Sequence, residues 1–280
     1  MARISTFVDE AAEARYRSVY DDALAVLPDH ERVDTDTEFG TLRALTFGDG
    51  DATPVVLLHG MSCTSAMWAP NIAALAAGRR VIALDAIADC GGSRQTAPIS
   101  GRGDVVVSIV QSLAELGVER AHFVGLSYGA WAAAGCAVEA PELVASLSLL
   151  EPAATLHPIK AAYVLGLLAS FVRRSPRRWD FLFHRRPFDE LIALLDASRG
   201  FRPAGPLPHS LKDDELAAIV APTQVILGSH STTCDEARTR KRLAPLPQVP
   251  VHLVEHAGHI VSVDQPEAVN RLLAAFIAKR

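Results

Sequence analysis

This 280-residue chain has neither an excess of positive charge nor a cysteine framework. Its 27 Lys and Arg residues are outnumbered by 32 Asp and Glu residues, which gives a formal net charge of -5. Binding of nucleic acid draws mainly on positive charge facing phosphates, so nucleic acid is not an expected partner. The cysteines lack the C-x-x-C spacing of zinc sites and stand at Cys63, Cys90, Cys136 and Cys234. We therefore expect reduced thiols, no metal site and no cofactor.

Long apolar runs are also missing. No segment approaches the ~20 apolar residues that a membrane span needs, and residues 1–7 lack the apolar core of a signal peptide. These absences predict a soluble, cytoplasmic protein with no membrane partner. Hydrophobic residues nevertheless make up 49% of the chain, which is enough for the core of one large domain.

Short apolar runs alternate with helical stretches along most of the chain. The periodicity predicts an N-terminal helix over residues 8–27 and an antiparallel strand pair over 31–39 and 41–47. It also predicts a helix over 104–116, with Asp104 as N-cap and Gly117 just beyond its end. Further strands are predicted at 55–58, 81–84, 121–124, 143–150, 223–227 and 251–254. Runs that are apolar on both faces and separated by helices indicate an α/β fold with a mostly parallel sheet covered on both sides.

The alternation lapses between Pro152 and Pro222. Helical patterns over 159–174 and 188–198 are followed there by a proline-rich stretch, 202–209. We interpret this region as a helical cap inserted between two core strands. The predicted organisation is a core of residues 1–152 and 221–280 with a cap over 153–220.

The pentapeptide Gly125-Leu126-Ser127-Tyr128-Gly129 stands between an apolar strand pattern and an alanine-rich helical pattern. It matches G-x-S-x-G, in which a serine occupies a sharp strand-to-helix turn and small neighbours let the backbone close around it. Ser127 is the candidate nucleophile.

A serine nucleophile needs a base and donors for the developing oxyanion. His259 follows Gly258 on a loop after a late strand and is the candidate base, whereas His256 lies closer to the strand end and is interpreted as structural or solvent-facing. The amide of Tyr128 and the amide of Met61, which follows His59-Gly60 after an early strand, are the candidate oxyanion donors.

Taken together, these motifs resemble those of the α/β-hydrolase superfamily, and in particular its capped esterase-like members. The resemblance rests on 57–60, the loop 85–93, the elbow 125–129, and Gly258-His259 with 265–267, and it spans roughly residues 40–280 in the family's order. It implies the α/β-hydrolase fold, a mostly parallel twisted sheet with helices on both faces and a helical cap.

The chain departs from the family at the acid of the triad. The resemblance implies an aspartate three residues after Gly228, but Ser231 stands there. Glu151 is the first substitute, because it ends a core strand where some relatives carry their acid. Asp235 is the second, although it can equally cap a helix; Asp85 and Asp264 are weaker candidates, and a dyad with no acid is the remaining possibility.

The leading functional prediction is a serine hydrolase that cleaves a small carboxylic ester or lactone through an acyl-enzyme. One alternative is a thioesterase, because arginines cluster in the predicted cap and could meet an acyl carrier protein or coenzyme A: Arg173, Arg174, Arg177, Arg178, Arg185 and Arg186. Another is a non-hydrolytic biosynthetic cyclase, lyase or small-molecule binder, which would have no need for the missing aspartate.

Overall fold

The computed structural model describes residues 3–172 and 176–279. Ten strands are described: β1 Thr6–Phe7, β2 Glu31–Thr37, β3 Gly40–Leu58, β4 Arg79–Leu84, β5 Arg94–Gln95, β6 Ala121–Leu126, β7 Val144–Leu150, β8 Phe201–Arg202, β9 Thr223–Gly228 and β10 Val251–Val254. Ten α-helices accompany them in the described residues: α1 Glu10–Ala25, α2 Ala69–Leu75, α3 Arg102–Glu115, α4 Tyr128–Glu139, α5 Ala161–Val172, α6 Asp189–Ala197, α7 Asp213–Ala218, α8 Glu236–Arg242, α9 Val261–Asp264 and α10 Pro266–Ile277.

The main sheet runs in the order β10-β9-β7-β6-β3-β2, with β4 and β5 also paired to β3. Strands β10, β9, β7, β6 and the end of β3 are parallel, and β2 pairs antiparallel with the start of β3. Parallel strands point their carboxyl ends to one edge of the sheet. The loops that follow β3, β4, β6, β7, β9 and β10 therefore meet at that edge.

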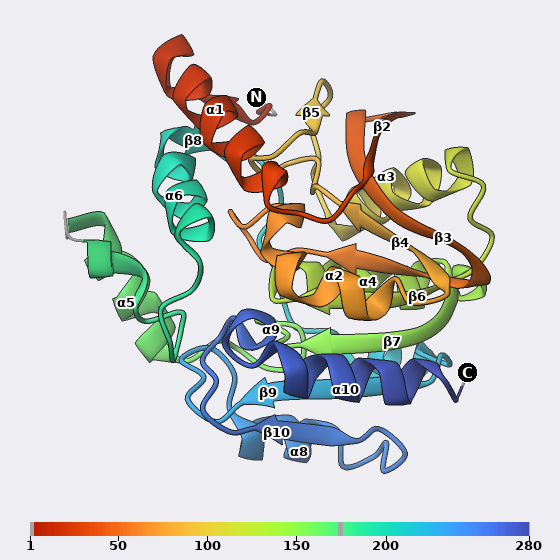
Figure 1. The fold of residues 1–280 in the computed structure, drawn as a ribbon. Coiled ribbons are helices and arrows are strands. Elements are labelled where there is room, and N and C mark those ends of the chain that lie inside the picture. The colour runs from red at the N-terminus through yellow and green to blue at the C-terminus, as the bar shows by residue number, and fades with distance from the viewer. Residues whose placement is uncertain (1–2, 173–175, 280) are drawn as a thin grey trace.

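Helices cover both faces of this sheet, and each face has its own apolar core (Figure 1). Val56 and Leu58 pack into the core beneath α3 and α4, whereas Val55 and Leu57 pack into the core beneath α2 and α10. Side chains alternate across a strand, so a strand buried on both faces is apolar throughout. This is why the predicted parallel strands are continuous apolar runs.

One strand differs from the prediction. The sequence indicates separate strands at 41–47 and 55–58, but β3 continues from Gly40 to Leu58. Register shifts occur between residues 44 and 55, and both the 44–47 and the 55–58 segments pair with residues 81–84 of β4. The strand therefore bends around β4, and the glycines at 48 and 50, which resemble a turn, lie in the bend.

The start of α3 corrects another detail. Gly101, not Asp104, is the N-cap of this helix, and the helix begins at Arg102. Asp104 lies in the first turn, where its carboxylate accepts hydrogen bonds from the amide and hydroxyl of Ser100. These bonds lower the pKa of Asp104. Gly117 has the left-handed φ of 69° expected just after the helix.

Between β7 and β9 the chain forms α5, α6, β8 and α7. Figure 1 shows α5 and α6 beyond the carboxyl ends of the strands, with α1 beside α6. Strand β1 pairs with β8 through Phe7 and Phe201, whose rings are 5.1 Å apart. The N-terminal segment thus contacts the stretch of chain between β7 and β9.

Two further observations bear on the predicted class of protein. The four cysteines are free thiols and all are buried. In the described part of the chain, no helix has the length and apolar character needed to cross a membrane.

Candidate active site

Ser127 lies on a tight turn between β6 and α4. Its φ of 56° is in the left-handed region, and its amide donates to the carbonyl of Leu150 at 2.9 Å. A Cβ on Gly125 would lie 2.2 Å from the carbonyl oxygen of Gly129, and one on Gly129 would lie 2.0 Å from that of Leu58. Only glycine fits at either position, which is the physical content of the G-x-S-x-G motif.

His259 approaches this serine from the loop between β10 and α9. Its Nε2 atom lies 3.0 Å from the Ser127 Oγ atom, and the residue is only 3% exposed. The ring of Tyr163 from α5 packs edge-on against it at 5.5 Å. His256 turns away: it is exposed and stands near the rings of His184 and His230.

Glu151 supplies a carboxylate on the far side of the His259 ring. It directly follows β7, has a left-handed φ of 45° and is fully buried. Its Oε2 atom lies 3.2 Å from His259 Nδ1, while its Oε1 atom accepts a hydrogen bond from the amide of Gly228 at 2.8 Å. The end of β9 therefore fixes the carboxylate that faces the imidazole.

Ser231 occupies the position where the resemblance implied an aspartate. Its hydroxyl donates to Glu151 Oε2 and accepts hydrogen bonds from the amides of Thr233 and Cys234. It therefore supports the glutamate and does not contact the imidazole. Nothing in the sequence pattern predicted this supporting role.

Asp235, the alternative acid, lies at the start of α8. Its carboxylate accepts a hydrogen bond from the Arg238 amide at 2.9 Å as the helix N-cap, and this bond lowers the pKa of Asp235. The carboxylate that contacts the His259 ring is that of Glu151.

The other two aspartates organise loops around the site. Asp85 is fully buried and accepts from the amides of Ser65 and Gly92 and from the Tyr20 hydroxyl. Asp264 accepts from the amides of Gly258, His184 and Arg185, and so joins the His259 loop to the inserted segment. The bridging role of Asp264 was not predicted. The one sequence feature that could have indicated it is the position of this acid at the end of the apolar stretch 260–263.

The two predicted oxyanion donors flank the serine. Tyr128 is the first residue of α4, so its amide has no acceptor in its own helix. Met61 follows Gly60, at which a Cβ would lie 3.4 Å from the Ser127 Cβ atom. This close approach brings the 60–65 loop against the serine turn.

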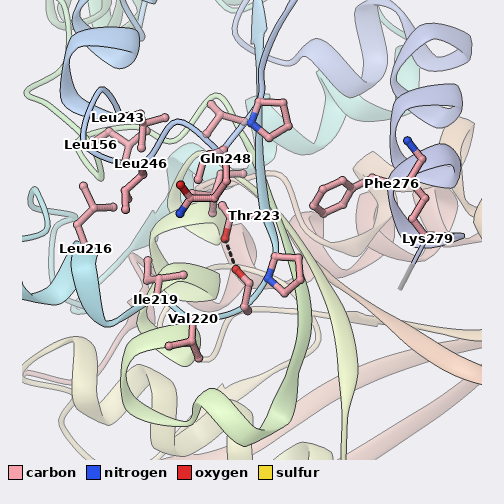
Figure 2. Close-up of a pocket in the computed structure, with 16 residues that line it drawn as sticks. Leu156, Leu216, Ile219, Val220, Thr223, Leu243, Leu246, Gln248, Phe276 and Lys279 are labelled. Atoms are coloured by element: carbon pink, nitrogen blue, oxygen red, sulfur yellow. Dashed lines mark hydrogen bonds between the residues drawn. The ribbon is translucent and has the colours of Figure 1, made fainter.

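Met61 and Tyr128 both line a pocket of 280 Å³ that is also bordered by Ala88, Asp89 and the segment 203–207. A second pocket, of 440 Å³, lies near the amino ends of β9 and β10 and is shown in Figure 2. Its lining is largely aliphatic and includes neither Ser127 nor His259. Ser127 and His259 do not line the 280 Å³ pocket either, and it is assigned to the candidate chemistry because Met61 and Tyr128, the candidate oxyanion donors, line it. In residues 3–172 and 176–279, no group of three or more His, Cys, Asp or Glu side chains could hold a metal ion.

Known proteins resemble this chain over nearly its whole length. The family model described as "Alpha/beta hydrolase family" matches residues 55–272. Carboxylesterase YbfK of Bacillus subtilis (strain 168) is 30% identical over 276 residues, covering 94% of this chain and 93% of that protein. The uncharacterized carboxylesterase nap of the same strain is 30% identical over 291 residues, covering 99% of this chain and 97% of that protein.

Among solved structures, the naproxen esterase (carboxylesterase NP) from Bacillus subtilis superimposes with a TM-score of 0.89 at 26% identity. The match covers 97% of this chain and 99% of that one. The superposition shows that the two proteins share their fold over nearly the whole chain. The chain belongs to the alpha/beta hydrolase family.

Proposed function

We propose that this protein hydrolyses small carboxylic esters, lactones included, through an acyl-enzyme formed on Ser127. The observation that carries the proposal is the continuous contact from Ser127 Oγ through the His259 ring to Glu151. The names of the similar proteins, carboxylesterase and naproxen esterase, support an ester as the substrate.

In the acylation step, His259 Nε2 takes the proton of Ser127 Oγ as that oxygen attacks the ester carbonyl carbon. Negative charge then develops on the carbonyl oxygen, and the amides of Met61 and Tyr128 are the donors that would stabilise it. The imidazole becomes positive in this step. Glu151 holds it by Nδ1 and offsets its charge, the role that a triad acid has in serine hydrolases.

Collapse of the tetrahedral intermediate breaks the bond to the alcohol, which leaves with the proton held by His259. Water then attacks the acyl-enzyme with His259 again as base, which releases the carboxylic acid and restores Ser127. Each proton transfer uses one atom, Nε2, at 3.0 Å from the serine oxygen.

Residues 153–220 are proposed to act as a cap over this site, on a core formed by 1–152 and 221–280. Two contacts support this division: Tyr163 of α5 packs against the His259 ring, and the segment 203–207 borders the pocket beside the oxyanion donors. The volume of that pocket, 280 Å³, suits one arm of a small ester.

No specific observation favours a carrier-dependent thioesterase. Arg178 pairs with Asp196 at 3.4 Å and Arg186 with Asp189 at 2.8 Å, so these two charges are engaged within the insertion itself. Arg173 and Arg174 lie outside the described residues. The non-hydrolytic alternative rested on the missing aspartate, and the contact between Glu151 and His259 removes that support.

The proposal is tested by measuring hydrolysis of p-nitrophenyl butyrate by the wild type and by Ser127→Ala. The wild type should turn over the ester, and the variant should lose at least about 10³-fold in kcat with an unchanged thermal unfolding midpoint. Equal turnover by the two proteins would refute the assignment of Ser127.

A further inference from the structure

A buried carboxylate lies in the pocket beside the oxyanion donors. Asp89 is 7% exposed and stands on the loop after β4. Among the described residues that line this pocket, it is the one carboxylate or basic side chain; the other residues present aliphatic groups, prolines, a glycine, a methionine and Tyr128. The pocket therefore combines an apolar wall with a single carboxyl group, that of Asp89.

The immediate partners of Asp89 are two backbone amides and the thiol of Cys90. The Ser62 amide donates to one carboxylate oxygen at 2.6 Å and the Cys90 amide donates to the other at 2.8 Å. Within residues 3–172 and 176–279, no lysine or arginine forms an ion pair with it at salt-bridge distance. Burial raises the pKa of Asp89, and the neighbouring His59 ring and the two amides oppose that rise.

These partners leave acceptor capacity on the carboxylate. Its two oxygens have four lone pairs, of which two accept the amides and one faces the Cys90 thiol, so one acceptor site remains. A second carboxylate entering the same apolar pocket would face repulsion and would lose its water. A cationic nitrogen there would instead supply the missing counter-charge, and the attraction is stronger than in water because the surroundings are largely apolar.

The geometry of the pocket makes this charge relevant to the substrate. Met61 and Tyr128, whose amides are the candidate oxyanion donors, both line the pocket, so an ester held at those amides would have one of its arms beside it. The opposite wall is close: a Cβ on Gly205 would lie 2.7 Å from the Ala88 Cβ atom. Ser5 fixes that separation, since its hydroxyl donates to the Ala88 carbonyl and accepts from the Ala204 amide.

We propose that Asp89 makes this pocket a charge-selective subsite that prefers esters carrying a cationic nitrogen on the enclosed arm and disfavours esters carrying a carboxylate there. The inference rests on the proposed ester hydrolysis at Ser127 and adds the substrate class to it.

The test compares neutral, anionic and cationic esters, and the effect of charge is read from how each variant changes their ratio. One series varies the acyl arm: p-nitrophenyl butyrate, mono-p-nitrophenyl succinate and p-nitrophenyl 4-(trimethylammonio)butyrate. The other varies the alcohol arm: the butyrates of 3,3-dimethylbutanol, 3-hydroxypropanoate and choline. Values of kcat/KM are measured for the wild type, Asp89→Asn and the control Asp36→Asn, which removes an exposed charge from β2.

In at least one series the wild type should prefer the cationic over the anionic ester by about tenfold or more, and Asp89→Asn should reduce that ratio by about tenfold. The neutral ester should change only a few-fold, and Asp36→Asn should keep the wild-type ratio. The series that responds identifies which arm of the ester enters the pocket.

A second variant avoids disturbing the bonds of Asp89. Leu207 is 76% exposed at the rim of the same pocket, so Leu207→Lys should fold normally and shift selectivity towards the anionic ester. If the wild type hydrolyses the neutral esters but neither variant changes the charge ratio in either series, the subsite is overturned while ester hydrolysis stands. If no neutral ester is hydrolysed by the wild type, the proposed function itself fails.

Discussion

Glu151 contacts His259 because the ends of β7 and β9, which pair in the sheet, lie side by side. From the sequence, Glu151, Asp235 or no acid at all could orient His259. The choice depends on how the end of β7 lies beside the end of β9, which no local pattern encodes. The hydrogen bond from the Gly228 amide to Glu151 is the contact that brings the carboxylate to the imidazole.

Glu151→Gln should lower kcat by about 10³–10⁴-fold with little effect on KM, because the neutral amide cannot offset the imidazolium charge. Asp235→Asn should stay within about threefold of the wild type, since asparagine also caps helices well. Steady-state kinetics on p-nitrophenyl butyrate measures both. A large loss in Asp235→Asn with a fully active Glu151→Gln would reverse the assignment.

Ser231 allows a second test at this scale, because its hydroxyl contacts the same Glu151 oxygen that faces His259. Glu151→Gly should lose about 10³-fold in kcat. The double variant Glu151→Gly/Ser231→Asp should recover at least about tenfold of that loss, because it has an acid at the position that the family resemblance implied. Ser231→Asp alone should impair the enzyme, because two buried carboxylates would then be in contact. A folded double variant with no recovery would contradict this account of the position.

At the scale of helices and strands, the sequence predicted the parallel strands, the serine turn and the histidine loop well. Each of these depends on a local pattern: an apolar run, a pair of glycines, or a glycine beside a histidine. The bend of β3 around β4 was missed because the apolar pattern is interrupted over residues 48–54. The N-cap of α3 was predicted three residues late. Asp104 lies inside the first turn of the helix, where its carboxylate accepts a hydrogen bond from the Ser100 amide, and the N-cap is Gly101.

Contact between the insertion and the His259 loop is also an element-scale property, and Gly258 is central to it. A Cβ there would lie within 3.0 Å of backbone atoms of Leu182, Phe183 and His184. Gly258→Ala should therefore lower kcat/KM by about tenfold or more and destabilise the fold by about 1–3 kcal/mol, because backbone must move to make room.

Gly103→Ala is the matched control for that variant. Gly103 lies in α3, where the added Cβ would be 3.4 Å from the end of the Glu139 side chain, and alanine is a better helix former than glycine. Kinetics and urea unfolding should show wild-type activity and equal or greater stability. Equal behaviour of the two alanine variants would mean that the insertion does not depend on this contact.

For the whole molecule, the sheet gathers residues from distant parts of the sequence at one edge. Met61 follows β3, Ser127 follows β6, Glu151 follows β7 and His259 follows β10. Two apolar cores, one on each face of the sheet, fix the strands whose ends carry these residues. The position of the site was predictable from this topology, whereas the hydrogen bonds among its members were not.

Stability of the whole fold should depend on pH through His122 in β6. Burial, together with the positive charges of Arg79 and Arg120, lowers the pKa of His122 from 6.5 to about 4. Below pH 6.5 the unfolded chain binds a proton that the folded protein excludes. The shifted pKa of His122 should therefore lower the free energy of unfolding by about 2–3 kcal/mol as the pH drops from 7 towards 4. Above pH 7 His122 is neutral in both states and should not affect stability.

Urea unfolding at pH 7.5 and pH 4.5 checks this prediction in the wild type and in His122→Gln. Between pH 7.5 and pH 4.5, His122→Gln should lose about 2–3 kcal/mol less of its free energy of unfolding than the wild type loses. The control His230→Gln, which replaces an exposed histidine, should lose as much as the wild type. An identical pH-dependent loss in His122→Gln and wild type would contradict a role for the buried ring.

The measurement that tests the central claim most directly is covalent labelling with a fluorophosphonate, read out by intact-protein and peptide mass spectrometry. The account predicts one adduct per chain on Ser127 and no adduct in Ser127→Ala. Labelling of Glu151→Gln should be much slower, because the variant lacks the carboxylate that positions His259 and offsets the positive charge of its imidazolium. An adduct on another residue, or labelling of Ser127→Ala at the wild-type rate, would contradict the assignment of Ser127, His259 and Glu151 as the catalytic unit.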